Sequence, residues 1–90
     1  EFIYCANDEL AVGVLKALNE VGISVPNDVA IAGFDGIQLI DFVTPKLTTI
    51  KINHFEWGRQ IAGYLTRLLT NINVYPLTNP EATIVIGESV

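Results

Sequence analysis

Apolar residues in the first third of the chain change their spacing twice. Residues 2–6 (FIYCA) are a short run of apolar β-formers, which is typical of a strand buried on both faces. Residues 7–22 then carry apolar side chains three or four positions apart, which predicts one amphipathic helix. Residues 29–34 (VAIAGF) are apolar again. Strand, helix and strand of these lengths predict a βαβ unit with parallel strands and a right-handed crossover.

The two ends of this helix carry residues that suit helix ends. Asn7 and Asp8 can both cap a helix N-terminus, and capping explains Asp8 better than ligand binding does. Gly22 follows the last turn, where a residue with left-handed backbone is favoured, and Ile23 can pack back on that turn. We therefore expect the helix to end just before Gly22.

The rest of the chain predicts a second strand–helix pair and a final strand. Asn53 followed by Glu56 is the pattern of a capping box, with Asn53 as N-cap. The expected elements are a loop at 35–47, a strand at 47–52, a helix at 54–70, a loop at 71–81 with a short extended piece at 73–75, and a strand at 82–87.

Composition narrows the class of protein. Ninety residues make one domain at most, and a hydrophobic content of 50% excludes disorder. The formal net charge of −5 argues against direct binding to nucleic acid. We see no membrane-length apolar run and no signal peptide, which fits residence in the cytoplasm. The chain starts inside a predicted strand, as a piece of a longer protein would.

Polar residues follow both strands of the predicted βαβ unit. Asn7 comes after the first strand and Asp35 after the second, and ligands bind beyond the carboxyl ends of strands in open parallel sheets. A carboxylate suits a pair of hydroxyls, and an amide can both donate and accept. The alternative for Asp35 is an Asx-turn before Gly36, and the residue pattern alone leaves both open.

Catalytic and metal-binding roles have less support in the sequence than effector binding. Asp35 has no evident acid, base or nucleophile as a partner. His54 and Glu56 form an H-x-E pattern, but Glu56 suits the capping box. Ligand spacing for a metal is missing, and the single Cys5 is expected to be a buried, inert thiol. We expect four other side chains near the second helix to be structural or solvated: Phe55 and Trp57 as core anchors, Lys51 and Arg59 as solvated charges.

Several motifs, in order and at matching spacing, resemble the lactose-repressor (LacI/GalR) family of regulators. They are A-N-D-E-x-A at 6–11, G-I-x-V-P-x-D-V at 22–29, G-F-D at 33–35, L-T-T at 47–49 and the final IVIGES. The resemblance covers nearly all of the chain. It implies an α/β fold, namely a parallel sheet with flanking helices in three layers, as the C-terminal part of a type 1 periplasmic-binding-protein-like effector domain.

The resemblance also implies roles for particular residues. The asparagine of A-N-D and the aspartate of G-F-D contact the effector in such proteins, usually a sugar, sugar phosphate or nucleobase-type ligand, and these are Asn7 and Asp35 here. The helix after A-N-D and the segment after G-F-D belong to the family's dimer interface. The candidates for that interface are Ala11, Val12, Leu15, Ile40 and Phe42.

Three departures from the family pattern bear on the effector site. Lys46 stands where a second proline is common, Ile52 and Asn53 replace Gln-Pro, and Gly87 replaces an arginine. The changes at Ile52 and Gly87 put polar contacts near the lobe hinge in doubt and point to a different effector. We also expect the apolar stripe of the 54–70 helix to lack its usual partner, and so to fold back on the local sheet or to pair with another copy.

The function that follows is a hypothesis with alternatives. The resemblance implies a cytoplasmic, homodimeric transcription regulator that binds a sugar-like effector, is not an enzyme, uses no cofactor and touches no membrane. Operator DNA would be bound only through an N-terminal helix-turn-helix outside these 90 residues. The alternatives are a periplasmic sugar-binding or sensor module of the same fold, and a small α/β hydrolase or phosphatase that uses Asp35.

Overall fold

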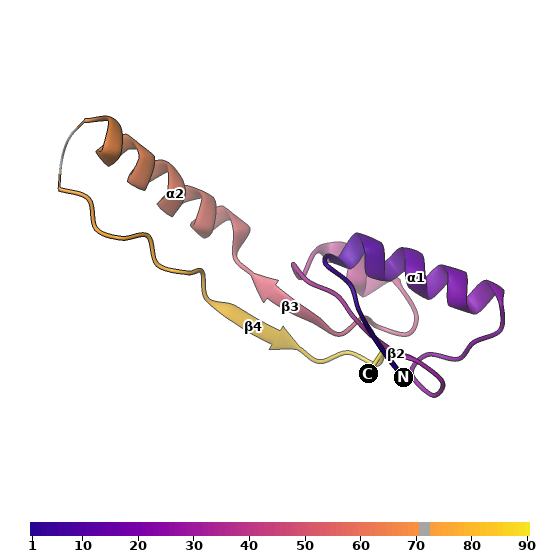
Figure 1. The fold of residues 1–90 in the computed structure, drawn as a ribbon. Coiled ribbons are helices and arrows are strands. Elements are labelled where there is room, and N and C mark those ends of the chain that lie inside the picture. The colour runs from indigo at the N-terminus through magenta and orange to yellow at the C-terminus, as the bar shows by residue number, and fades with distance from the viewer. Residues whose placement is uncertain (71–72) are drawn as a thin grey trace. The chain divides into compact units, whose positions relative to one another are not determined.

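The computed structural model describes residues 1–70 and 73–90, and the chain divides into two units (Figure 1). The first, which we call the sheet unit, contains residues 1–51 and 83–90. The second, the helix unit, contains residues 52–82. The chain therefore leaves the sheet unit after Lys51 and returns to it at Thr83.

The sheet unit begins with the predicted strand, helix and strand. These are β1 (Phe2–Tyr4), α1 (Asp8–Glu20) and β2 (Ala30–Ala32). The two strands pair in parallel, with Phe2 opposite Ala30, which confirms the predicted direction. Both strands are shorter than their apolar runs.

The ends of α1 are held as the sequence indicates, with one difference. The Asn7 side-chain oxygen accepts a hydrogen bond from the Leu10 N–H at 2.8 Å, so Asn7 is the N-cap. Asp8 is the first helical residue, and its assignment as the cap was wrong. At the other end Gly22 has a φ of 75°, and the Ile23 N–H donates to the Leu18 carbonyl at 2.9 Å. This is the expected left-handed helix stop.

Two further strands form a second two-stranded sheet beside the first. β3 (Thr49–Ile52) lies beside the continuation of β2, through parallel bridges that pair Ala32 with Thr48 and Asp35 with Lys51. β4 (Ala82–Val85) is hydrogen-bonded to β3, and their arrows point in opposite directions in Figure 1. The chain then runs back to the middle of the sheet, where the Ile31 N–H donates to the Ser89 carbonyl at 2.7 Å.

The core lies where α1 covers the sheet. Its buried side chains are Cys5, Ala11, Leu15, Ile31, Ile40 and Leu47. Ile40 comes from a 3-10 helix, η1 (Gln38–Phe42), where the sequence predicted only a loop. That turn forms because Ile40, 5% exposed, anchors it in the core and α1 contacts it. Cys5 is buried as expected, and this burial raises the pKa of its thiol.

One face of β1 contradicts the prediction that this strand is buried on both sides. Phe2 and Tyr4 are 58% and 55% exposed, whereas Ile3 between them is partly buried beside the core. Alternate residues of a strand point to opposite faces. The described chain therefore covers one face of β1 and leaves the other open.

The helix unit consists of α2 (His54–Leu69) and an irregular segment, residues 73–81. The Asn53 side-chain oxygen accepts a hydrogen bond from the Glu56 N–H at 3.0 Å, which confirms Asn53 as the N-cap. No residue of α2 is buried. Phe55 is 83% exposed and is not the predicted core anchor. The first two residues of the predicted 71–81 loop lie outside the described residues.

Candidate effector site at the strand ends

The ends of β1 and β2 meet through backbone hydrogen bonds. The Cys5 N–H donates to the Ala32 carbonyl at 2.8 Å, and the Asp8 N–H donates to the Phe34 carbonyl at 2.9 Å. The segment that carries Asn7 therefore lies against the segment that leads into Asp35. The structure thus brings together the neighbourhoods of the two residues selected from the sequence.

Asp35 has an unusual backbone. Its φ is 114°, the only positive φ among the described residues that are not glycine, and its side chain is partly buried. Its N–H donates to the Ile50 carbonyl on β3 at 2.8 Å. A non-glycine residue in this region costs about 1–3 kcal/mol, so the surrounding contacts must hold it there.

An Asx-turn does not explain Asp35. Such a turn would use the N–H two residues on, which belongs to Ile37. In the structure the Ile37 N–H donates to Asp8 at 2.9 Å, and the Gly36 N–H donates to the same carboxylate oxygen at 2.7 Å. The turn after β2 is thus fixed by Asp8, from the start of α1.

Asp8 is a buried carboxylate that joins three segments. Its side chain is fully buried, with 0% exposure. One oxygen accepts the Gly36 and Ile37 N–H groups, and the other accepts the Thr49 hydroxyl at 2.5 Å. A buried charge is tolerated when it receives several good hydrogen bonds. We refer to these four residues, Asp8, Gly36, Ile37 and Thr49, as the Asp8 bracket.

Sequence reasoning missed this bracket although its residues lie in motifs that carried the resemblance. Asp8 belongs to A-N-D, and Thr49 belongs to L-T-T. The available signal was the polar residue in each of two short motifs, although for Asp8 the local role of a helix cap competed with it. Asp8 and Thr49 lie 41 positions apart in the chain, so their hydrogen bond produces no periodic pattern in the sequence.

Glycines at the strand ends allow the close approach. A side chain at Gly33 would collide with the Asp8 carboxylate. Gly36 has a φ of 73°, and a Cβ there would lie 2.7 Å from the Lys51 Cβ. Both glycines flank the strained Asp35. Only a backbone without side chains fits between Asp8 on one side and β3 on the other.

A second buried polar cluster, around Ser89, ties the C-terminal segment to the middle of the sheet. Ser89 is 0% exposed; its hydroxyl donates to the Ile31 carbonyl at 2.6 Å and accepts the Thr48 N–H at 2.8 Å. The Gly87 N–H donates to the Thr48 hydroxyl at 2.9 Å. A side chain at Gly87, where the family pattern has arginine, would collide with the Lys46 and Leu47 carbonyls.

The five residues proposed for a dimer interface divide into two groups. Ala11, Leu15 and Ile40 are 0%, 7% and 5% exposed and belong to the core of this chain. Val12 is partly buried, and Phe42 is 83% exposed. Only Val12 and Phe42 are therefore available to touch a second copy.

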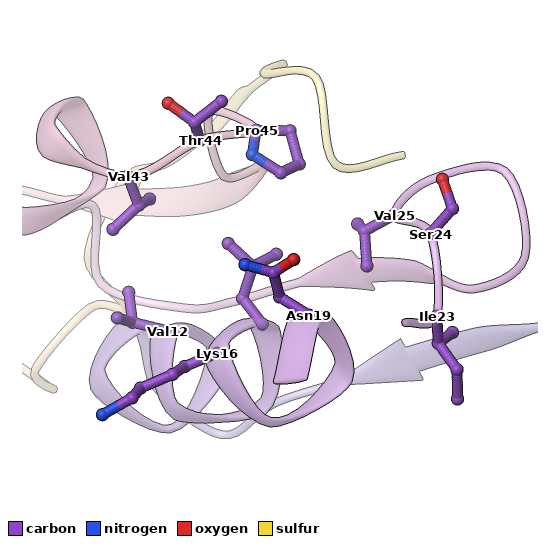
Figure 2. Close-up of a pocket in the computed structure, with 10 residues that line it drawn as sticks. Val12, Lys16, Asn19, Ile23, Ser24, Val25, Val43, Thr44 and Pro45 are labelled. Atoms are coloured by element: carbon purple, nitrogen blue, oxygen red, sulfur yellow. The ribbon is translucent and has the colours of Figure 1, made fainter. Parts of the chain in front are cut away.

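Val12 lines a hollow that is distinct from the strand ends. The hollow has a volume of about 390 Å³ and lies between α1 and the segments at 23–25 and 43–45. Figure 2 shows Val12, Lys16 and Asn19 of α1 on one side and the 43–45 segment opposite. Neither Asn7 nor Asp35 lines it.

The H-x-E pattern of α2 has no features of a catalytic pair. The Glu56 carboxylate accepts two hydrogen bonds from the Arg59 guanidinium, at 2.6 and 2.9 Å, and one from Gln60 at 3.1 Å. The bonds from Arg59, followed by that from Gln60, lower the pKa of Glu56 to about 2. So acidic a carboxyl is a poor base at neutral pH. Arg59 is exposed, as a solvated charge should be, and it also forms an ion pair with Glu56.

Among residues 1–70 and 73–90, no group of three His, Cys, Asp or Glu side chains could hold a metal ion. Within the same residues, no helix has the length and apolar character needed to cross a membrane.

Comparison with known families decides the class. Residues 3–90 match the periplasmic binding protein-like domain, which leaves only two residues of the chain outside the match. The chain belongs to the periplasmic binding protein-like domain family. This confirms the predicted α/β fold with parallel strands and helices.

Within this family the similar proteins are LacI-family regulators. The transcriptional repressor MelR of Bacillus subtilis is 46% identical over 59 residues, which are 66% of this chain and 17% of that protein. A LacI-family regulator from Enterococcus faecium, solved with bound ribose, is 32% identical with a TM-score of 0.83, covering 98% of this chain and 33% of that one.

A third relative binds a larger sugar. A LacI-family regulator from Arthrobacter sp. FB24, solved with lactose, is 36% identical with a TM-score of 0.79, covering 98% of this chain and 34% of that one. The predicted resemblance to the LacI family is therefore confirmed. The chain spans about a third of the length of these solved relatives and about a fifth of the curated ones.

Proposed function

We propose that the chain is the effector-binding part of a LacI-family transcription regulator, and that Asn7 and Asp35 contact a sugar-like effector. The observation that carries this proposal is the backbone of Asp35. The residue is held at a φ of 114°, at the end of β2 and beside the segment of Asn7. Strained residues of this kind gather at ligand sites, and a carboxylate suits paired hydroxyl groups.

The ligands of the relatives support the choice of a sugar. Regulators from Enterococcus faecium and Arthrobacter were solved with ribose and with lactose. The Asn7 side-chain oxygen is engaged as a helix cap, so its NH₂ group is the part that reaches a ligand. The pair then offers one donor and one charged acceptor to neighbouring hydroxyls.

In this proposal the protein acts by coupling two sites. Effector binding changes the affinity of the whole protein for operator DNA, and operator DNA changes the affinity for effector by the same factor. DNA is bound by a part of the protein outside these 90 residues. The whole protein acts as a homodimer in the cytoplasm. The protein is a regulator rather than an enzyme, in keeping with the relatives named above.

Calorimetric titration tests the site. The full gene product is titrated with ribose, lactose, a sugar phosphate and a nucleobase, first as wild type and then as Asp35→Ala. We expect one of these ligands to bind, and Asp35→Ala to weaken that binding at least about tenfold, since a hydrogen bond to a charged group contributes about 1.5–3 kcal/mol. Glu20→Ala, which removes an exposed carboxylate from the last turn of α1, serves as the control and should bind normally. Unchanged affinity in Asp35→Ala would sink the assignment.

A second candidate is a sugar-binding or sensor module that contacts no DNA. The family match supports this candidate, because the matching domain is named after periplasmic binding proteins. Gel-shift measurements with the upstream region of the gene separate the two. Sugar-dependent retention of that DNA supports the regulator, and sugar binding without any retention supports the module.

A further inference from the structure

We propose that Asp8 is a positioning residue for the effector site: its carboxylate holds the loop after β2 in the shape that presents Asp35, and ties this shape to β3. The inference rests on the proposed function, in which Asp35 contacts the effector. It concerns a residue whose own side chain is fully buried and does not reach a ligand.

The hydrogen bonds on both sides of Asp35 carry the argument. Before it, the Phe34 carbonyl accepts the Asp8 N–H at 2.9 Å. After it, the Gly36 and Ile37 N–H groups donate to one Asp8 oxygen at 2.7 and 2.9 Å. Asp8 therefore forms hydrogen bonds to the chain immediately before and immediately after Asp35, the residue with the positive φ.

The other side of the loop is fixed to β3. The Asp35 N–H donates to the Ile50 carbonyl at 2.8 Å, and the second Asp8 oxygen accepts the hydroxyl of the neighbouring Thr49. The same strand thus bonds to Asp35 directly and to Asp8. A residue whose φ costs about 1–3 kcal/mol keeps that conformation only when its surroundings hold it there. Here the Asp8 carboxylate accepts three hydrogen bonds, two from the loop after Asp35 and one from β3.

Capping of α1 does not explain the position of Asp8. Asn7 already caps α1, through the Leu10 N–H. Gly33 lies so close that any side chain there would collide with the Asp8 carboxylate. The Asp8 carboxylate therefore loses its solvation on burial, and its hydrogen bonds hold the loop of Asp35 and not its own helix.

Amide hydrogen exchange in the full gene product tests the positioning role without any ligand. In Asp8→Asn the charge is lost, and we expect the Gly36 and Ile37 amides to exchange about 10- to 100-fold faster, as the loss of charged acceptors implies. The Leu10 amide, bonded to Asn7 next door, should be unchanged. Ser89→Ala is the matched control, because it removes an equally buried polar group that bonds to the Ile31 carbonyl and the Thr48 N–H and not to the loop of Asp35.

The pattern of exchange separates positioning from general stability. Faster exchange confined to the loop in Asp8→Asn, and absent from that loop in Ser89→Ala, supports the inference. A uniform rise over the sheet unit, the same in both variants, would mean that Asp8 is only a stabilising residue. Unchanged protection of Gly36 and Ile37 would overturn the inference as well.

Thr49 provides a gentler test that keeps Asp8 intact. Thr49→Val removes the hydroxyl that donates to Asp8 with little change of shape, and Thr49→Ser keeps the hydroxyl. Titrated with ribose or lactose, whichever binds the wild type more tightly, Thr49→Val should bind about tenfold more weakly, and Thr49→Ser should recover most of the loss. Equal affinity of both variants and the wild type would refute the coupling to the site.

The two proposals can fail separately. If Asp35→Ala leaves sugar affinity unchanged while the exchange pattern appears as expected, the proposed function fails and the loop-holding role of Asp8 stands. If Asp35→Ala abolishes binding while Asp8→Asn leaves the loop protected, the effector site stands and the positioning role fails.

Discussion

The sheet unit and the helix unit stabilise their structures in different ways. Every buried residue of the described chain lies in the sheet unit, including the four polar ones: Asp8, Thr48, Thr49 and Ser89. No described residue of the helix unit is buried, and Leu65, Leu68 and Leu69 of α2 are 51%, 45% and 85% exposed. One unit is held by a core and by long-range polar bonds, the other by short-range bonds along one helix.

The two units also differ in how far apart in the chain their bonded residues lie. The bonds of α2 join residues three or four positions apart, such as Arg59 with Glu56 and Thr66 with Ala62. A helix of 16 residues supported only by such bonds is marginal in water. Among the described residues, no buried polar side-chain atom lacks a hydrogen-bond partner, whereas leucines of α2 remain exposed to solvent.

The same leucine deletion in each unit should have the largest and most unequal effects. Leu47 is 0% exposed in the core, so Leu47→Ala should lower the free energy of unfolding by about 2–5 kcal/mol. Leu69→Ala removes a side chain that is already in water and should change it by less than about 0.5 kcal/mol. Urea unfolding of the 90-residue chain, followed by circular dichroism, measures both. A large loss in Leu69→Ala would mean that another copy or another segment covers α2.

Much of the sheet unit could be predicted because its signals are local. The change of apolar spacing gave β1, α1 and β2, and Gly22 gave the end of α1. The burial of β1 could not be predicted in the same way. Phe2 and Tyr4 look like core residues in the sequence, but burial depends on whether another layer covers their face.

The candidate site shows the same limit more sharply. Asn7 and Asp8 are equally good caps by residue type, and only the fold shows that Asp8 turns away to bind partners 28 and 41 positions along the chain. Asp35 was found because it follows a strand. Its strained backbone was not, since φ is set by contacts with Asp8 and β3 that no pattern in the sequence encodes.

Adding one methyl group to a glycine should have opposite effects in the two units. Gly36 has a φ of 73° and no room beside Lys51, so Gly36→Ala should cost about 1–2 kcal/mol for the left-handed backbone and a further 1–3 kcal/mol, roughly, for crowding. Gly63 lies within α2 with nothing near the position of a Cβ, and Gly63→Ala should stabilise the helix by about 0.5–1 kcal/mol. Thermal unfolding of both variants gives the sign directly, and a stable Gly36→Ala protein would show that the loop of Asp35 can relax.

A matched pair of threonines tests the buried polar bonds. Thr48 is 7% exposed and accepts the Gly87 N–H, so Thr48→Val leaves that donor without its partner and should cost about 1–3 kcal/mol. Thr66 bonds to a carbonyl on the exposed surface of α2, where Thr66→Val should stay within about 0.5 kcal/mol. Urea midpoints provide the measurement. Equal losses in the two variants would contradict the view that buried polar bonds contribute more to stability than exposed ones.

The smallest effect should come from acid acting on the helix unit. Arg59 holds the pKa of Glu56 at about 2, below its ordinary value of 4.5, so the folded helix binds this proton less readily than the unfolded chain does. The contribution of the pair is therefore fully present above about pH 4.5 and is lost as the pH falls toward 2. Carbon-13 titration of the Glu56 carboxyl should give a midpoint near 2 in the wild type and a clearly higher one in Arg59→Gln. Because the pair is exposed, salt should screen much of the difference, and a midpoint that ignores both Arg59 and salt would show that the pair does not form in solution.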